Sequence, residues 1–155
     1  MGFQITPLKR SDYRHLFAMS DQQLAAIGSR RVTVESPDAT PCRISLVDAV
    51  VGERVILTNY RHQPGDTPFK ASHAIFVREN AKDAVFAANR VPQMFRSRTL
   101  AIRGFDRDHM MIEAELCDGN LAADVATRLL ENSKVEYLHL HFAAAGCFAA
   151  RANRI

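Results

Sequence analysis

Two histidines stand two residues apart near the end of the sequence, at His139 and His141. They alternate with Leu138, Leu140 and Phe142, and this period of two is typical of a β-strand. In a strand the two imidazoles project from the same face. Because imidazole is a common metal ligand, this spacing suits the binding of one metal ion.

Cys147 follows this pair closely and could fold back toward it, because Gly146 permits a tight turn. A metal-binding protein that uses His139, His141 and Cys147 is therefore one hypothesis. The alternative is a half-buried strand face on which the two histidines form hydrogen bonds with neighbouring groups, as most buried polar groups do.

A second hypothesis is a small-molecule-binding domain or small enzyme, in which histidine acts as acid or base and arginine holds an anion. The polar loop over residues 61–70 lies between two apolar strands, a common place for a binding site. We expect one cleft between this loop, the Cys42–Arg43 segment and the end of the chain. The catalytic candidates are His73, His139, His141 and Cys147. The ligand-binding candidates are Cys42, Arg43, His62, Arg78 and Arg151.

A third hypothesis is a non-catalytic, homodimeric interaction or structural domain, in which these side chains only pack and form hydrogen bonds. No nucleotide-binding, zinc-protease or nucleophile-elbow motif occurs in the sequence. The sequence therefore leaves the cofactor, the substrate and the existence of an enzymatic reaction open.

Composition narrows the class of protein. The length of 155 residues, 47% of them hydrophobic, predicts one domain over residues 1–155. Twenty basic residues against 17 acidic ones give a net charge of +3, too small to indicate nucleic-acid binding. Three separated cysteines and no visible signal peptide predict a cytoplasmic protein. No apolar run is long enough to predict a membrane span.

Hydrophobic periodicity predicts an α+β fold with one mixed, mainly antiparallel sheet of about six or seven strands and helices packed on one face. We expect the segment around 54–60 to be central in the sheet, because its apolar run is continuous. The predicted strands are 3–6, 30–35, 54–60, 74–79, 98–105, 110–116, 134–143 and 147–151. The predicted helices are 11–17, 21–27, 83–89 and 120–132.

Several sequence blocks, taken in their order and spacing, are similar to a bacterial family of unknown function, domain-of-unknown-function family 1203. The blocks are residues 41–46, 52–60, 72–79, 139–141 and 146–151. The resemblance implies a soluble bacterial protein with a single domain of this length. It implies no activity and assigns no catalytic residue.

Overall fold

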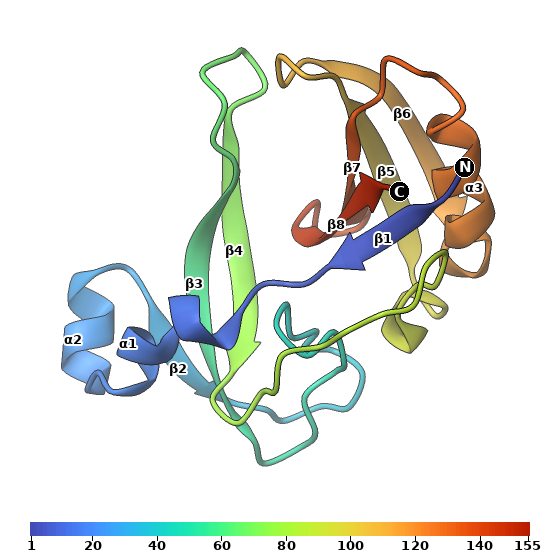
Figure 1. Ribbon diagram of the computed structural model, residues 1–155. Helices are drawn as coiled ribbons and strands as arrows, with labels where there is room; N and C mark the ends of the chain where they lie inside the picture. The colour runs from blue at the N-terminus through green and yellow to red at the C-terminus, as the bar shows by residue number, and fades with distance from the viewer.

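The computed structural model describes residues 1–155 and contains eight strands and three short α-helices (Figure 1). The strands are β1 (Phe3–Thr6), β2 (Arg30–Thr33), β3 (Arg54–Gln63), β4 (Ala71–Arg78), β5 (Thr99–Phe105), β6 (Met111–Asp118), β7 (Tyr137–Phe142) and β8 (Phe148–Arg154). The helices are α1 (Arg14–Phe17), α2 (Asp21–Ala26) and α3 (Ala122–Leu129), with 3-10 turns at Arg10–Asp12, Gln93–Phe95 and Gly119–Leu121. None of these helices combines the length and the hydropathy that crossing a membrane requires.

The strands form two antiparallel sheets, so the prediction of a single sheet is wrong. One sheet has five strands in the order β1-β8-β7-β5-β6, and the other has three in the order β2-β3-β4. The chain leaves the first sheet after β1, builds the second one, and returns at β5. The α+β class and the antiparallel pairing are confirmed, and β3 is central in its sheet as its apolar run predicted.

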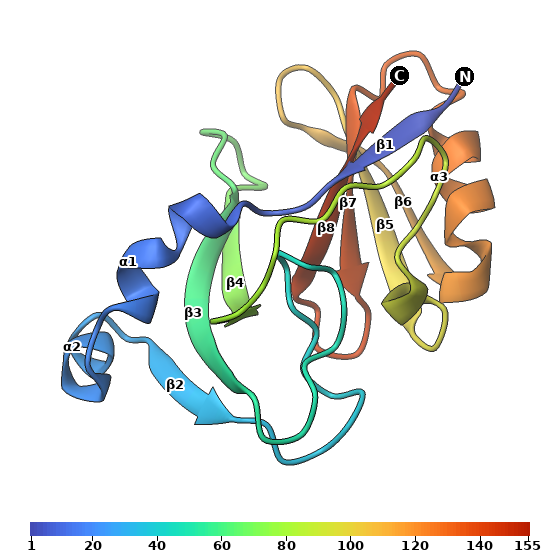
Figure 2. The same cartoon turned by 60° about the horizontal axis from the view of Figure 1, so that its bottom comes forward.

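The helices pack on different sheets rather than on one shared face. Side chains of α1 and α2 join the core of the three-stranded sheet, together with Ile56 and Ile75. Side chains of α3 join the larger core of the five-stranded sheet, together with Ile102 and Leu140. Figures 1 and 2 show the two sheets side by side, with α3 on the outer side of the larger one.

The helix predicted over 83–89 is absent, and this segment is an extended connection between the sheets. The Asn89 amide donates to the Phe3 carbonyl (2.9 Å), and the Phe3 amide donates to the Asn89 side chain (2.9 Å). The Gln4 side chain also donates to the Phe86 carbonyl. Because β1 is an edge strand with free backbone groups, these hydrogen bonds replace those of a local helix.

Candidate functional site

Strand β7 places two of the candidate imidazoles on the face of the five-stranded sheet that is turned away from α3. Leu138 and Leu140 lie in the larger core, so the intervening His139 and His141 point to the other side. This is the alternation that the sequence predicted. All six residues of β7 are buried, because the three-stranded sheet covers the histidine face.

His62 supplies a third imidazole from the other sheet. Strand β3 continues to Gln63, so His62 lies in a strand rather than in the predicted loop. The pairing of β3 with β4 shifts register between Tyr60 and Gln63, and such a bulge re-aims side chains. The His62 ring centroid lies 5.7 Å from that of His139 and 4.9 Å from that of His141. One ring nitrogen from each of the three lies within 4.8 Å of the others.

Each of the three rings has a buried nitrogen without a hydrogen-bond partner. These atoms are His62 Nδ1, His139 Nδ1 and His141 Nε2. The other nitrogen of His141, Nδ1, lies 3.0 Å from the Gly146 carbonyl oxygen, so it carries the proton and leaves Nε2 as an acceptor. A buried polar atom without a partner is unfavourable, so three of them at one place are an unusual concentration.

Burial keeps these imidazoles neutral. It lowers the pKa of His139 from its ordinary 6.5 to about 2, and the positive charges of neighbouring groups add to the effect. Burial likewise lowers the pKa of His141 to about 3 and that of His62 to about 4, although the hydrogen bond to Gly146 acts in the opposite direction on His141. A neutral imidazole has a free lone pair, which is the form that binds a metal ion.

Aromatic side chains pack against the three histidines. The Phe148 ring stacks on His62 at 5.5 Å with an interplanar angle of 9°. The same ring meets His139 and His141 edge-on at 5.2 and 5.9 Å. Phe105 covers His139 from another side at 4.9 Å. These rings fix the orientation of the imidazoles and limit the access of water.

The chemistry of this donor set fits a transition-metal ion. Imidazole nitrogen suits zinc, copper, nickel and iron, and three protein ligands leave one coordination position open. Zn–N bonds of about 2.1 Å place the nitrogens of a tetrahedral site about 3.4 Å apart. The nitrogens here lie within 4.8 Å of one another, so the rings would turn inward on binding.

A small cleft of about 210 Å³ opens beside the cluster. His62, His139 and Arg151 line it, together with the rings of Tyr60 and Phe148. The predicted residues His139 and Arg151 therefore share one cleft, but His73 and Cys42, which the cleft hypothesis placed with them, do not line it. His62 belongs to this cleft as well as to the imidazole cluster.

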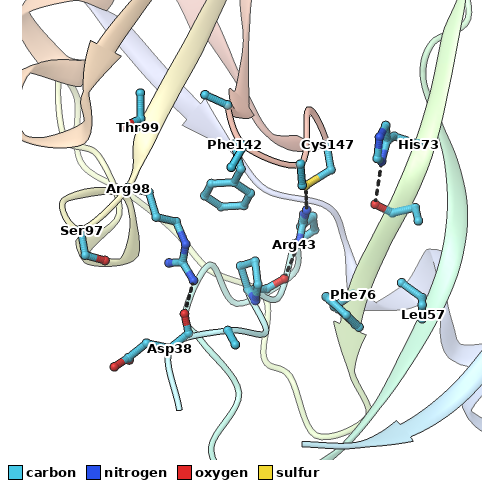
Figure 3. Close-up of a pocket in the computed structure, with 16 residues that line it drawn as sticks. Asp38, Arg43, Leu57, His73, Phe76, Ser97, Arg98, Thr99, Phe142 and Cys147 are labelled. Atoms are coloured by element: carbon cyan, nitrogen blue, oxygen red, sulfur yellow. Dashed lines mark hydrogen bonds between the residues drawn. The ribbon is translucent and has the colours of Figure 1, made fainter. Parts of the chain in front are cut away.

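Three other candidates line a separate and larger cavity of about 560 Å³ (Figure 3). Arg43, His73 and Cys147 line it, and much of the remaining wall is apolar. The prediction of a single cleft is therefore wrong, because its candidate residues line two different cavities. Arg98, which the sequence did not single out, also lines the larger cavity and forms an ion pair with Asp48.

Cys147 does not join the imidazoles, in contrast to the predicted metal set. Its sulfur accepts a hydrogen bond from Arg43 Nη2 at 3.0 Å, which Figure 3 shows. Arg43 is buried and also donates to the carbonyl oxygens of Phe148 and Pro41. Burial lowers the pKa of the Arg43 guanidinium, while the neighbouring Cys147 opposes that effect. The third residue that lies with His139 and His141 is His62 rather than Cys147.

Two ligand-binding candidates lie away from both cavities. Cys42 is fully buried in the core of the three-stranded sheet, where its sulfur accepts from the Arg78 amide at 3.3 Å. The Arg78 guanidinium forms a 2.5 Å ion pair with Glu53 and donates to Ser45. Both side chains therefore have structural partners, and neither lines the two cavities.

The fold and the histidine cluster define a two-sheet protein with three converging imidazoles, each with one nitrogen that has no hydrogen-bond partner. The chain belongs to the family of proteins of unknown function DUF1203, whose family model matches residues 39–154. This span contains His62, His139 and His141, and the resemblance seen in the sequence blocks is confirmed. No curated protein and no solved structure matches the chain.

Proposed function

We propose that the protein binds one divalent transition-metal ion, with zinc as the first candidate, through His62, His139 and His141. The observation that carries this proposal is the convergence of three buried imidazoles, each with a nitrogen that has no hydrogen-bond partner. A metal ion would take one ring nitrogen from each of the three histidines. It would keep an open coordination position for an exogenous ligand, as metal sites with three protein ligands do.

The aromatic side chains around the histidines support this proposal. Hydrophobic surroundings control how solvent reaches a metal and influence the properties of a bound ligand. Phe148 and Phe105 supply such surroundings here, and Gly146 supplies the hydrogen bond that orients His141.

Elemental analysis of protein purified without a histidine tag tests the proposal. We expect about one equivalent per chain of zinc or of another first-row transition metal, consistent with one three-ligand site. In a competition assay with a chromophoric chelator, His62→Gln should bind zinc more than about 100-fold more weakly, because even the loss of an outer partner costs about 10–100-fold. His15→Gln is the matched control, since His15 is exposed.

A Cys147→Ser variant separates the two possible ligand sets. We expect it to keep the wild-type zinc affinity, because Cys147 contacts Arg43 instead of the imidazoles. In cobalt-loaded protein we expect no sulfur-to-metal charge-transfer absorption. Absence of metal uptake by the wild type, or equal zinc affinities of His62→Gln and His15→Gln, would reject the three-histidine site.

The larger cavity favours a second candidate function, the binding of a small and mostly apolar molecule. Its volume of about 560 Å³ lies within the range of small-molecule sites, about 300–1,000 Å³. Nine of its 16 lining residues are hydrophobic, while Arg43 and Cys147 provide polar groups that could orient a ligand.

Substitution of an alanine that lines this cavity tests the second candidate. An Ala144→Phe side chain would occupy part of the space, whereas Ala25→Phe adds the same ring on the exposed side of α2. In an NMR screen of apolar fragments, we expect binding to the wild type and to Ala25→Phe, and weaker binding to Ala144→Phe. Unchanged binding to Ala144→Phe would place the ligand elsewhere.

A further inference from the structure

Two arginines flank the histidine cluster in a row across three neighbouring strands. Arg103 of β5 is paired with His139 of β7, and His139 is paired with Arg151 of β8. Directly paired residues of antiparallel strands point to the same face, with Cβ atoms about 4.5–5.5 Å apart. His139 therefore lies between two guanidinium groups on the face that carries the imidazoles.

Neither arginine is neutralised by a carboxylate. Arg151 Nε donates to the amide oxygen of Asn153 at 2.7 Å, and its guanidinium carbon lies 3.7 Å from the centroid of the Tyr137 ring. The Arg103 side chain forms neither a hydrogen bond nor an ion pair, although it is half-buried. By contrast, Arg78 and Arg98 both form ion pairs with acidic residues.

The charges that act on the three imidazoles are all positive. Arg103 lowers the pKa of His62, His139 and His141, and Arg151 lowers that of His139. No acidic side chain opposes them at any of the three rings. A divalent ion bound by neutral histidines would add two more positive charges, so the site has an excess of positive charge that an anion would offset.

Arg151 also reaches the place where such an anion could lie. It lines the small cleft with His62 and His139, and the cleft volume is about 210 Å³. This volume lies below the range of about 300–1,000 Å³ that is typical of sites for larger ligands. The cleft is therefore suited to a small anion rather than to a nucleotide or a larger cofactor.

We infer that the open position of the metal centre takes a small oxyanion, such as inorganic phosphate or a short carboxylate. Arg151 would hold one anion oxygen directly, and another oxygen would occupy the open position on the ion. Arg103 would contribute its charge from the opposite side of His139. This inference rests on the proposed metal site for the second contact, whereas the pair of arginines belongs to the fold itself.

Calorimetric titration of inorganic phosphate tests the inference. The protein is loaded with one equivalent of zinc, freed of excess metal, and compared with the metal-free form. We expect phosphate to bind the zinc-loaded protein, more weakly at high salt, and the metal-free protein at least about tenfold more weakly, the loss expected for one strong charged contact. Acetate, titrated in the same way, distinguishes a phosphate site from a carboxylate site.

Three arginine variants identify the source of the affinity. Arg151→Gln should weaken phosphate binding by about tenfold or more, as expected for the loss of one charge-assisted hydrogen bond. Arg103→Gln should weaken it by a smaller factor, because Arg103 acts only through its charge. Arg107→Gln removes the same charge from an exposed turn and should leave the phosphate affinity within about twofold of wild type.

Zinc content and thermal unfolding, measured on the same samples, keep the two proposals separate. Zinc-loaded protein that binds neither phosphate nor acetate, or that loses equal affinity in Arg151→Gln and Arg107→Gln, would overturn the anion site and leave the metal centre intact. The protein could instead take up no zinc and still bind phosphate in a way that depends on Arg151. That result would overturn the metal centre and the proposed contact between the metal and an anion oxygen, and it would leave an anion site formed by arginine.

Discussion

The buried imidazoles predict a steep loss of stability of the metal-free protein in mildly acidic solution. His62, His139 and His141 have pKa values of about 4, 2 and 3, all below the ordinary value of 6.5. The unfolded chain therefore binds protons at these sites more readily than the native protein does. Their contribution to stability is fully present above about pH 6.5 and is lost as the pH falls below that value toward the native pKa values.

The size of this loss follows from the proton difference. Between pH 7 and pH 5.5 each histidine of the unfolded chain becomes largely protonated, whereas the native rings stay neutral. Proton linkage then removes about 4 kcal/mol of unfolding free energy for the three sites together, in equal shares. Glu53, whose pKa is lowered by its ion pair with Arg78, adds its own effect only at lower pH, below its ordinary 4.5.

Urea unfolding at the two pH values, followed by far-ultraviolet circular dichroism, measures this loss. With a denaturant slope of about 2 kcal/mol/M, the midpoint should fall by about 2 M between pH 7 and pH 5.5. His139→Gln should reduce the fall by about a third, because it removes one of the three titrating groups. His15→Gln, at an exposed position, should keep the whole effect.

Two results would refute this reasoning. The first is a midpoint that is the same at pH 7 and pH 5.5, which would mean that the imidazoles are protonated equally in both states. The second is an equal fall in His139→Gln and His15→Gln. That outcome would assign the pH dependence to groups outside the cluster.

Three further predictions concern the fold that holds the site. Gly119→Ala should lower the free energy of unfolding by more than about 3 kcal/mol, measured by thermal unfolding, because a Cβ there would overlap the Phe95 carbonyl group. Tyr137→Phe should lower the free energy of unfolding by about 1–3 kcal/mol, measured by urea unfolding. The reason is that the buried Gln63 amide would lose the hydroxyl to which it donates at 2.7 Å. Ser20→Ala should lower the free energy of unfolding by about 1 kcal/mol, measured by urea unfolding, because Ser20 forms the capping box of α2.

Each of these three predictions has a distinct contrary result. A Gly119→Ala protein as stable as the wild type would show that the turn before α3 has room for a side chain. Wild-type stability of Tyr137→Phe would mean that water replaces the lost hydroxyl. Wild-type stability of Ser20→Ala would mean that α2 is held by its packing on the three-stranded sheet alone.

Local patterns in the sequence predict much of this fold. The alternation over 137–142 predicts which side chains of β7 face the core and which face the polar cluster, because successive side chains of a strand point to opposite faces. Ser20 and Gly28 likewise predict the beginning and end of α2, since capping depends on nearby residues. The helix expected over 83–89 fails, because hydrogen bonds to the distant β1 decide that segment.

The candidate site is predicted only in part, for the same physical reason. His139 and His141 are neighbours on one strand, so the sequence reveals that they share a face. His62 reaches them from the other sheet, and no local pattern reports how two sheets pack. Arg103 becomes significant only through its pairing with His139, which depends on strand order. The sequence places Arg103 in the strand predicted over 98–105, but it does not show which residue of another strand lies beside it.

The distribution of the histidines over both sheets has a mechanical consequence. β3 and β7 belong to separate hydrogen-bonded sheets, and the chain passes from one sheet to the other between β1 and β2 and again between β4 and β5. An ion held by His62 together with His139 and His141 would be a cross-link at the seam where the sheets meet. A bound ion would then limit the separation of the two sheets. Amide hydrogen exchange in both β3 and β7 would be slower in the metal-bound protein than in the metal-free protein.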